Sequence, residues 1–346
     1  MTRYVEDNER IKHEYATHLR HAMGRDDTTI DKARAAIRRF EESTKFKPFK
    51  KFHRQQAVEF KTYLDRQKNT KTGRPLGVST IDATLRLVKG FFHWLVSRAG
   101  FKRLLTYADV EYFNNTRKAG RVAHAQREIP YPSMRQAAHA FQAMPFETEF
   151  QKRDKALFAF LMLTGARDGA VASLRLKHVN VELGHVFQDA REVKTKNAKM
   201  IHCQFFPVDA AYRECFVAYV TYLREVKLFG PEDALFPKAR VGVVEGQGFT
   251  NLGLAREPYA SAAKLNTIIK HAFAAVQMPR YTPHSFRKTL THLGSVLTKT
   301  PEEFKAWSLN LGHENVATTI NSYLPVTTER QLDLIRNMRA HQNEDD

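Results

Sequence analysis

Apolar residues recur at intervals of three and four over much of the chain, and this spacing restricts the protein to a mainly helical fold. The clearest example begins at Ser79-Thr80-Ile81-Asp82, a predicted capping box, and runs to about Gly100. Its apolar residues would share one helical face: Ile81, Leu85, Val88, Phe92 and Leu95. Similar patterns predict further helices at about residues 27–40, 54–67, 107–116, 133–144, 153–164, 171–176, 210–228 and 261–276.

One stretch of the chain has a convincing strand pattern. Residues 181–193 and 200–208 contain β-compatible residues, and the lysine-rich turn Lys194–Lys199 separates them. We therefore expect a small antiparallel sheet whose hairpin presents lysines. The glycine-rich segment 238–259 and the basic segment 69–77 are expected to be loops.

A change in composition divides the chain into parts. We expect residues 1–118 to form a small helical bundle and residues 131–346 to form a second, mainly helical domain with the small sheet and a C-terminal tail. Residues 119–130 would join them. The stretch RKAGRVAHAQRE, residues 117–128, is basic and lacks apolar periodicity, as is typical of a linker.

The charge balance indicates the class of partner. The formal net charge is +18 and the pI about 9.8, which favours a polyanion or an acidic membrane surface. Because no apolar run approaches the roughly 20 residues of a membrane span, we expect double-stranded DNA and no membrane; a generally basic surface is the alternative. Cys203 and Cys215 lack metal-ligand spacing, so we expect reduced thiols, no metal, no cofactor and a cytoplasmic location.

Three polar clusters could form a phosphate site. They are Thr164-Gly165-Ala166-Arg167, His284-Ser285-Phe286-Arg287 and the stretch from Leu311 to Tyr323. A phosphodiester under attack gains charge on its oxygens, and arginine binds such oxygens with a planar, permanently charged fork. Two arginines, Arg167 and Arg287, together with the imidazole of His313 would therefore make a metal-free clamp.

The same clusters offer a nucleophile and proton donors. Tyr323 has a weakly acidic hydroxyl, which nearby cations would activate toward phosphate. Lys194, at the start of the hairpin turn, could protonate the leaving 5′-oxygen, with Lys196 as the alternative. His284 lies three residues before Arg287, on the same helical face, and suits proton transfer or phosphate contact.

Taken together and in this order, the clusters resemble the tyrosine recombinases of the phage-integrase type. TGAR is similar to the first arginine box of that family, HSFR to its HxxR box, and LGH, Thr318-Thr319 and Tyr323 to its closing signature. The resemblance covers about residues 131–340. The N-terminal bundle is similar to the core-binding domain of the family only in its size, helicity and basic charge.

The resemblance implies a catalytic domain and a chemistry. Tyr323 would attack a DNA phosphate, form a 3′-phosphotyrosyl link and free a 5′-hydroxyl, without ATP or metal. A homotetramer would act on two DNA sites, with accessory DNA-bending proteins as possible partners in the nucleoid. The tail 326–338 would dock on a neighbouring protomer or pack on its own domain.

Two features depart from the family pattern. The acidic residue expected three positions after the first arginine is Ala170 here, and Asp168 is a possible substitute. The hairpin offers Lys194, Lys196 and Lys199, of which Lys194 best matches the usual setting.

Two other functions are compatible with these residues. A type IB topoisomerase would use the same chemistry to reseal one strand. A DNA-binding architectural protein on a degenerate recombinase scaffold would need none of it, and the intact Arg167, Arg287, His313 and Tyr323 argue against that reading.

Overall fold

The computed structural model describes residues 5–70, 72–124, 130–244, 248–323 and 328–337, which belong to two compact units, 1–126 and 127–346. Both units are mainly helical, and the strands lie in the second unit. The mainly α fold with a small antiparallel sheet is therefore confirmed. None of the helices in the described ranges combines the length and the apolar content that a membrane span requires.

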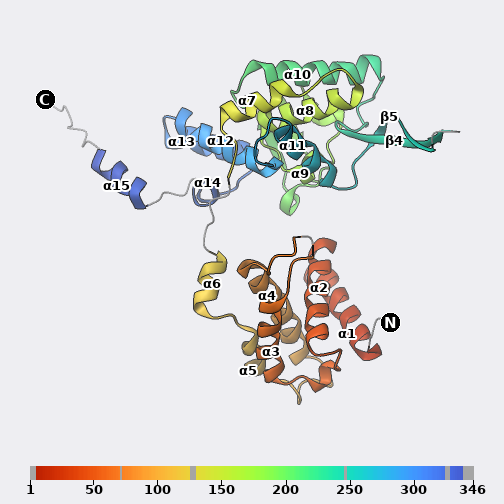
Figure 1. Cartoon of the computed structure of the whole chain (residues 1–346), viewed down its shortest axis with the longest axis vertical. Helices are drawn as coiled ribbons and strands as arrows, with labels where there is room; N and C mark the ends of the chain where they lie inside the picture. Colours follow the sequence, from red (N-terminus) through yellow and green to blue (C-terminus); the bar gives the residue numbers. More distant parts are fainter. Residues whose placement is uncertain (1–4, 71, 125–129, 245–247, 324–327, 338–346) are drawn as a thin grey trace. The chain divides into compact units, whose positions relative to one another are not determined.

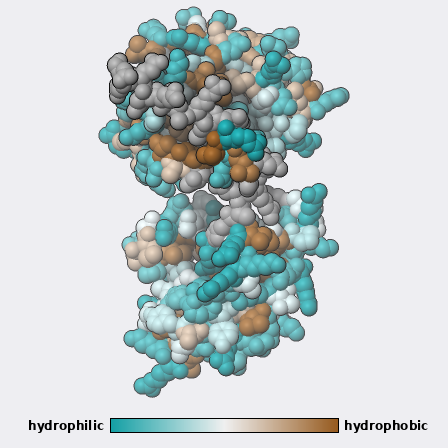
Figure 2. Space-filling model, turned by 90° about the vertical axis from the view of Figure 1, so that its left-hand side faces the viewer, coloured by the Kyte–Doolittle hydropathy of each residue, from teal (hydrophilic) through white to brown (hydrophobic). Residues whose placement is uncertain are grey.

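The first unit is a bundle around α4, Val78–Val96 (Figure 1). Its core is rich in aromatic rings; those of Phe40 and Phe92, for example, lie 5.1 Å apart at an angle of 78°. Hydrophilic residues cover most of the bundle on the face in Figure 2, and hydrophobic ones are scattered. The other helices are α1 (Glu6–Thr17), α2 (Asp27–Ser43), α3 (Arg54–Arg66), α5 (Tyr107–Val110) and α6 (Arg117–His124).

Two expectations for this unit need correction. The helix α4 begins after Gly77, which has no side-chain cap, so the capping box at Ser79 is wrong, and the helix ends at Val96 rather than Gly100. Part of the stretch 117–128 is helical: α6 covers residues 117–124 and packs against α4. Arginine, lysine and alanine favour helix, and the Thr116 hydroxyl accepts the N–H of Ala119 at 3.1 Å, which caps the first turn.

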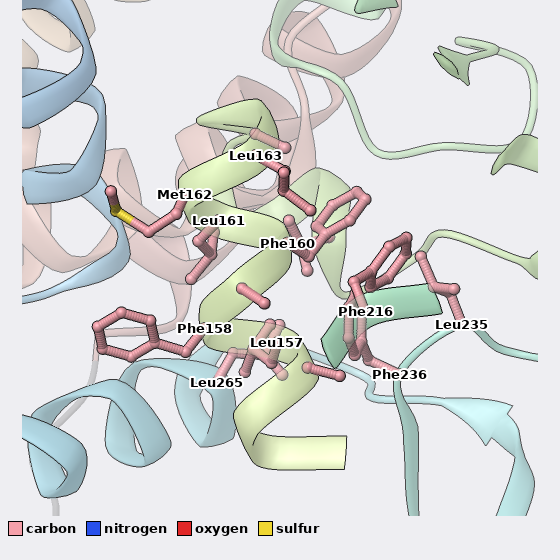
Figure 3. Close-up of a cluster of buried hydrophobic side chains, with 14 of the residues drawn as sticks. Leu157, Phe158, Phe160, Leu161, Met162, Leu163, Phe216, Leu235, Phe236 and Leu265 are labelled. Carbon is pink, nitrogen blue, oxygen red and sulfur yellow. The ribbon is translucent and has the colours of Figure 1, made fainter. Parts of the chain in front are cut away.

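The second unit is built around α8, Glu149–Thr164, which is buried on every side from Ala156 to Thr164. Figure 3 shows its leucines and phenylalanines meeting Phe216 of α10 (Ala210–Thr221), Leu265 of α11 (Ala263–Ala275), and Leu235 and Phe236, which immediately precede β4 (Pro237–Val244). A helix that is apolar all round belongs in a domain centre. The remaining helices are α7 (Met134–Ala143), α9 (Asp168–Val171), α12 (Pro283–Leu297), α13 (Pro301–Asn310), α14 (Val316–Tyr323) and α15 (Thr328–Asn337).

The expected hairpin forms a three-stranded antiparallel sheet in the order β1-β2-β3. Its strands are β1 (Val179–Asn180), β2 (His185–Gln188) and β3 (Ile201–Gln204). They are shorter than the expected 181–193 and 200–208, because a turn begins at Asp189, whose carbonyl accepts the N–H groups of Glu192 and Val193. The helix expected at 171–176 is wrong: α9 ends at Val171, residues 172–175 are not helical, and a 3₁₀ turn spans Leu176–His178.

The segment 238–259 was expected to be a loop, and this is wrong. It forms a two-stranded antiparallel ribbon of β4 (Pro237–Val244) and β5 (Gly248–Pro258). It extends from the body of the unit in Figure 1. The glycines of this segment suggested irregular structure, yet one of them is required by the ribbon. Gly253 has a left-handed backbone conformation with φ +109°, and a Cβ there would lie 2.8 Å from Glu149 Oε1. The strand register is irregular between Ala239 and Val241.

Candidate active site

Two tight glycine turns bring the clusters of the second unit together. Gly165 ends α8 with φ +57°, and a Cβ there would lie 2.7 Å from Leu311 Cδ2. Gly312 has φ +73°, and its Cβ would lie 2.8 Å from Ile201 Cδ1. Residues other than glycine rarely adopt this backbone conformation, and a side chain at either position would have no room. The two glycines therefore allow the TGAR turn, the LGH turn and β3 to approach closely.

Arg287 joins these turns from α12. Its side chain is almost fully buried, and Nη1 donates to the Gly165 carbonyl at 2.5 Å. Nη2 donates to the Leu311 carbonyl and to His313 Nε2, each at 2.7 Å. Nε is buried and has no hydrogen-bond partner among the described residues. These partners are polar but uncharged, so the guanidinium keeps its positive charge inside the protein, and its Nε donor is unused.

His313 is held as a neutral imidazole. Burial, then the charges of Arg287 and Arg167, lowers the pKa of His313 to about 3. Arginine can only donate, so Nε2 accepts from Arg287, and the ring proton is assigned to Nδ1. Nδ1 then donates to Thr319 Oγ1 at 2.7 Å, and the hydroxyls of Thr319 and Ser308 lie 2.5 Å apart.

Arg167 and His284 complete a group of four cationic or imidazole side chains. We call this group the cage and define it as Arg167, His284, Arg287 and His313. Arg167 immediately precedes α9 and is partly exposed, whereas His284 lies in the first turn of α12 and is exposed. Partial desolvation, then the charges of Arg287, Lys288 and Arg167, lowers the pKa of His284. The structure thus brings four of the sequence-predicted site residues within electrostatic range of one another.

The two hairpin lysines considered as the proton donor, Lys194 and its alternative Lys196, are not part of the cage. Lys194 is exposed, and its Nζ lies 3.4 Å from the Ala260 carbonyl, while Lys196 is an exposed residue of the 3₁₀ turn Lys196–Ala198. Lys199 is the hairpin lysine whose charge contributes to the lowered pKa of His313, and it forms an ion pair of 2.5 Å with Glu314.

Asp168 has hydrogen bonds that tie α9 to its surroundings. Oδ2 accepts from Asn266 Nδ2 of α11 at 2.9 Å, and Oδ1 accepts the N–H of Gly169 at 2.9 Å. Ala170, at the position where the family has an acidic residue, is buried. These contacts show Asp168 as a link between α9 and α11.

Tyr323 is the last residue of α14, and its side chain lies outside the part of the chain that the structure describes. The helix itself is anchored at the cage, because Thr319 binds both His313 and Ser308. Position 323 follows Thr319 by four residues, about one helical turn.

Two residues of the site were not singled out from the sequence. Ser308 supports Thr319, and the side-chain amide of Asn310 donates to the Gln204 carbonyl at 2.8 Å and accepts the Gln204 N–H at 2.7 Å. Neither has a sequence signal, because only the fold shows that α13 ends beside the free edge of β3. No three His, Cys, Asp or Glu residues among those described are grouped so that they could hold a metal ion.

The sequence matches the Phage integrase family over residues 134–330, more than half of the chain. The chain belongs to the phage integrase family. It is therefore a tyrosine recombinase, an enzyme class that breaks and rejoins DNA strands. No curated protein matches it by sequence.

Solved structures of low sequence identity share the fold of this recombinase. A lambda integrase dimer bound to a COC′ core site is 12% identical, with a TM-score of 0.62, and the match covers 91% of this chain and 94% of that one. XerH recombinase bound to difH is 15% identical (TM-score 0.57; coverage 94% and 83%). The Tn1549 transposon integrase with transposon right end DNA is 15% identical (TM-score 0.54; coverage 94% and 98%).

Proposed function

We propose that this recombinase cuts and rejoins DNA at specific sites through a 3′-phosphotyrosyl intermediate on Tyr323, without metal or ATP. The buried Arg287 guanidinium is the observation that carries the proposal. Its positive charge is balanced by carbonyls and an imidazole, and its Nε still has a donor to offer. A phosphate oxygen is the anion that such a site on a basic, DNA-acting chain would take.

The cage would stabilise the charge of the transition state. Arg167 and Arg287 would bind the non-bridging oxygens. His313 can join them if its proton moves from Nδ1 to Nε2, and the hydroxyl pair permits this, since Ser308 can donate to Thr319 and Thr319 to Nδ1. Arg287 Nη2 would then turn from the imidazole to the phosphate, so both groups become donors where charge develops.

The bond changes balance without a cofactor. The Tyr323 oxygen forms a bond to phosphorus as the phosphorus–O5′ bond breaks, and the phenolic proton passes to a base. The lowered pKa of His284 keeps it neutral near pH 7 and able to accept that proton. The leaving 5′-oxygen takes a proton from Lys194, or from Lys196 as the alternative, once the exposed hairpin reaches the DNA.

The assembly is also part of this proposal. We assign residues 1–118 to the core DNA-binding domain, 119–130 to the connection and 131–346 to the catalytic domain with its tail. The tail helix α15 has Leu332 and Ile335 exposed, which supports docking on a neighbouring protomer within a tetramer on two DNA sites. Accessory DNA-bending proteins and a nucleoid location complete the proposal.

Substitution of the nucleophile tests the chemistry. The cleaved positions are first mapped on DNA flanking the gene, and a nicked suicide duplex of that site is then incubated with wild type and Tyr323→Phe. We expect a denaturation-resistant protein–DNA species with wild type and none with the variant, which should still bind the duplex. An adduct with Tyr323→Phe would refute the assignment, and relaxation of supercoiled DNA without exchange between sites would indicate a topoisomerase.

A further inference from the structure

The segment that carries His313 runs antiparallel along the free edge of β3. Three contacts, spaced about two residues apart, define this arrangement. Asn310 binds the backbone of Gln204, Gly312 lies against Ile201, and Glu314 pairs with Lys199. The residue numbers fall from 204 to 199 as they rise from 310 to 314, so the two segments run in opposite directions. The register therefore places the Lys199–Glu314 ion pair directly beside His313.

The ion pair lies at an open groove of about 410 Å³ that His313 also lines. The two partners differ in exposure: the Lys199 side chain is 23% exposed and that of Glu314 is 73% exposed. The packed stem of Lys199 thus holds the ammonium at the groove, and the carboxylate reaches it from solvent. Exposed ion pairs are weak, so another anion can replace the carboxylate.

We propose that Glu314 is a built-in competitor for the DNA phosphate and that Lys199 is an additional phosphate-binding residue. In the DNA-free protein Glu314 holds Lys199. When DNA enters, a phosphate oxygen takes the place of the carboxylate, and Lys199 adds its positive charge beside His313. No covalent bond changes in this exchange. The inference rests on the proposed function, since it assigns a phosphate to the same site.

A double-mutant cycle tests this exchange in the Tyr323→Phe background, which keeps DNA binding non-covalent. The substitutions are Glu314→Gln, which retains the shape of the side chain, and Lys199→Met, which retains the stem of the lysine but not its charge. The control is Glu302→Gln, which removes the same charge from an exposed residue of α13. The dissociation constant of a duplex that contains the mapped site is measured by fluorescence anisotropy at constant salt.

We expect Glu314→Gln to tighten binding about two- to fivefold more than Glu302→Gln does, and Lys199→Met to weaken it about tenfold. With Lys199→Met in place, the two glutamine variants should bind alike, and Lys199→Arg should bind within about twofold of the parent because it keeps the charge. Equal effects of the two glutamine variants when Lys199 is present would overturn the proposal. So would a Glu314→Gln effect that persists in Lys199→Met, or a Lys199→Arg variant as weak as Lys199→Met.

This experiment fails separately from the proposed function. If wild type forms the Tyr323 adduct but the cycle shows no coupling, only the role of Lys199 and Glu314 is wrong. If wild type forms no adduct, the chemistry is wrong, whatever the binding cycle shows. Thermal unfolding of each variant confirms that the compared proteins are folded.

Discussion

The cage and the lysine hairpin contrast in how they are held. Arg287 and His313 are buried, and two tight glycine turns and a chain of hydrogen bonds fix them before any DNA is present. Lys194 and Lys196 are exposed, and Asn197 and Ala198, which follow Lys196 in the turn, adopt positive φ angles. The cage groups are held by buried hydrogen bonds, whereas the lysine side chains of the hairpin are exposed to solvent.

The difference matches what each region has to do. Groups that stabilise charge act best when they need no reorganisation at the moment of reaction. A proton donor for the leaving oxygen has to reach an atom that arrives with the DNA, so an exposed turn suits it. The contrast predicts that the loss caused by a substitution in the cage persists with any leaving group, and that the loss caused by a hairpin substitution can be bypassed chemically.

The largest effect should come from Arg287→Ala. Loss of a preorganised donor typically lowers the rate by about 10² to 10³, and we expect at least that loss in cleavage of the suicide duplex under single-turnover conditions. Arg280→Ala, which removes an exposed arginine outside the cage, is the control and should lose only a small part of the activity. Comparable losses in both variants would show that the burial of Arg287 has no special role.

Lys194→Ala should reduce the cleavage rate about a hundredfold, as expected for loss of a general acid. A 5′-thio leaving group needs no proton, so it should restore the rate, because the cage is intact. Lys196→Ala is the matched variant from the same turn. If the 5′-thio leaving group restores the rate of Lys196→Ala and not that of Lys194→Ala, Lys196 is the general acid.

Thr319→Val should have an intermediate effect, a loss of about tenfold in cleavage rate, because His313 Nδ1 and the Ser308 hydroxyl both lose a buried partner. The neighbouring Thr318→Val is the control, since Thr318 is exposed and the substitution is the same. If the two variants cleave equally fast, the hydroxyl pair does not set the proton position on His313.

The smallest effect should be that of acid pH on the free energy of unfolding. The pKa of His313 is about 3 in the folded protein and about 6.5 when unfolded, so the unfolded state binds the proton first. Its contribution to stability is complete above pH 6.5 and declines as the pH falls toward 3. Between pH 6.5 and 5.5 wild type should lose about 1 kcal/mol of unfolding free energy more than His313→Gln does. Parallel losses in urea titrations of the two proteins would contradict a buried neutral imidazole.

The sequence was sufficient to place the cage. The residue types and order of TGAR, HxxR and LGH predicted that Arg167, His284, Arg287 and His313 would come together. The glycines explain why the motifs can be recognised in the sequence. The fold requires glycine at positions 165 and 312, because other residues would be strained and would clash there.

The sequence was insufficient where tertiary contacts decide the structure. The segment 117–128 lacks an apolar stripe, yet Thr116 caps a helix there. The glycines of 238–259 suggested a loop, although the strands pair across them. Asn310 and Glu314 could not be recognised, because their partners Gln204 and Lys199 lie more than 100 residues away in the chain.

The central claim is that Tyr323 becomes joined to DNA, and mass spectrometry of the trapped adduct tests it most directly. Wild-type protein captured on the suicide duplex is digested with nuclease and protease, and the peptide that retains a nucleotide is sequenced. The account predicts a nucleotide linked through its 3′-phosphate to Tyr323. A nucleotide attached to any other residue, or linked through a 5′-phosphate, would contradict it.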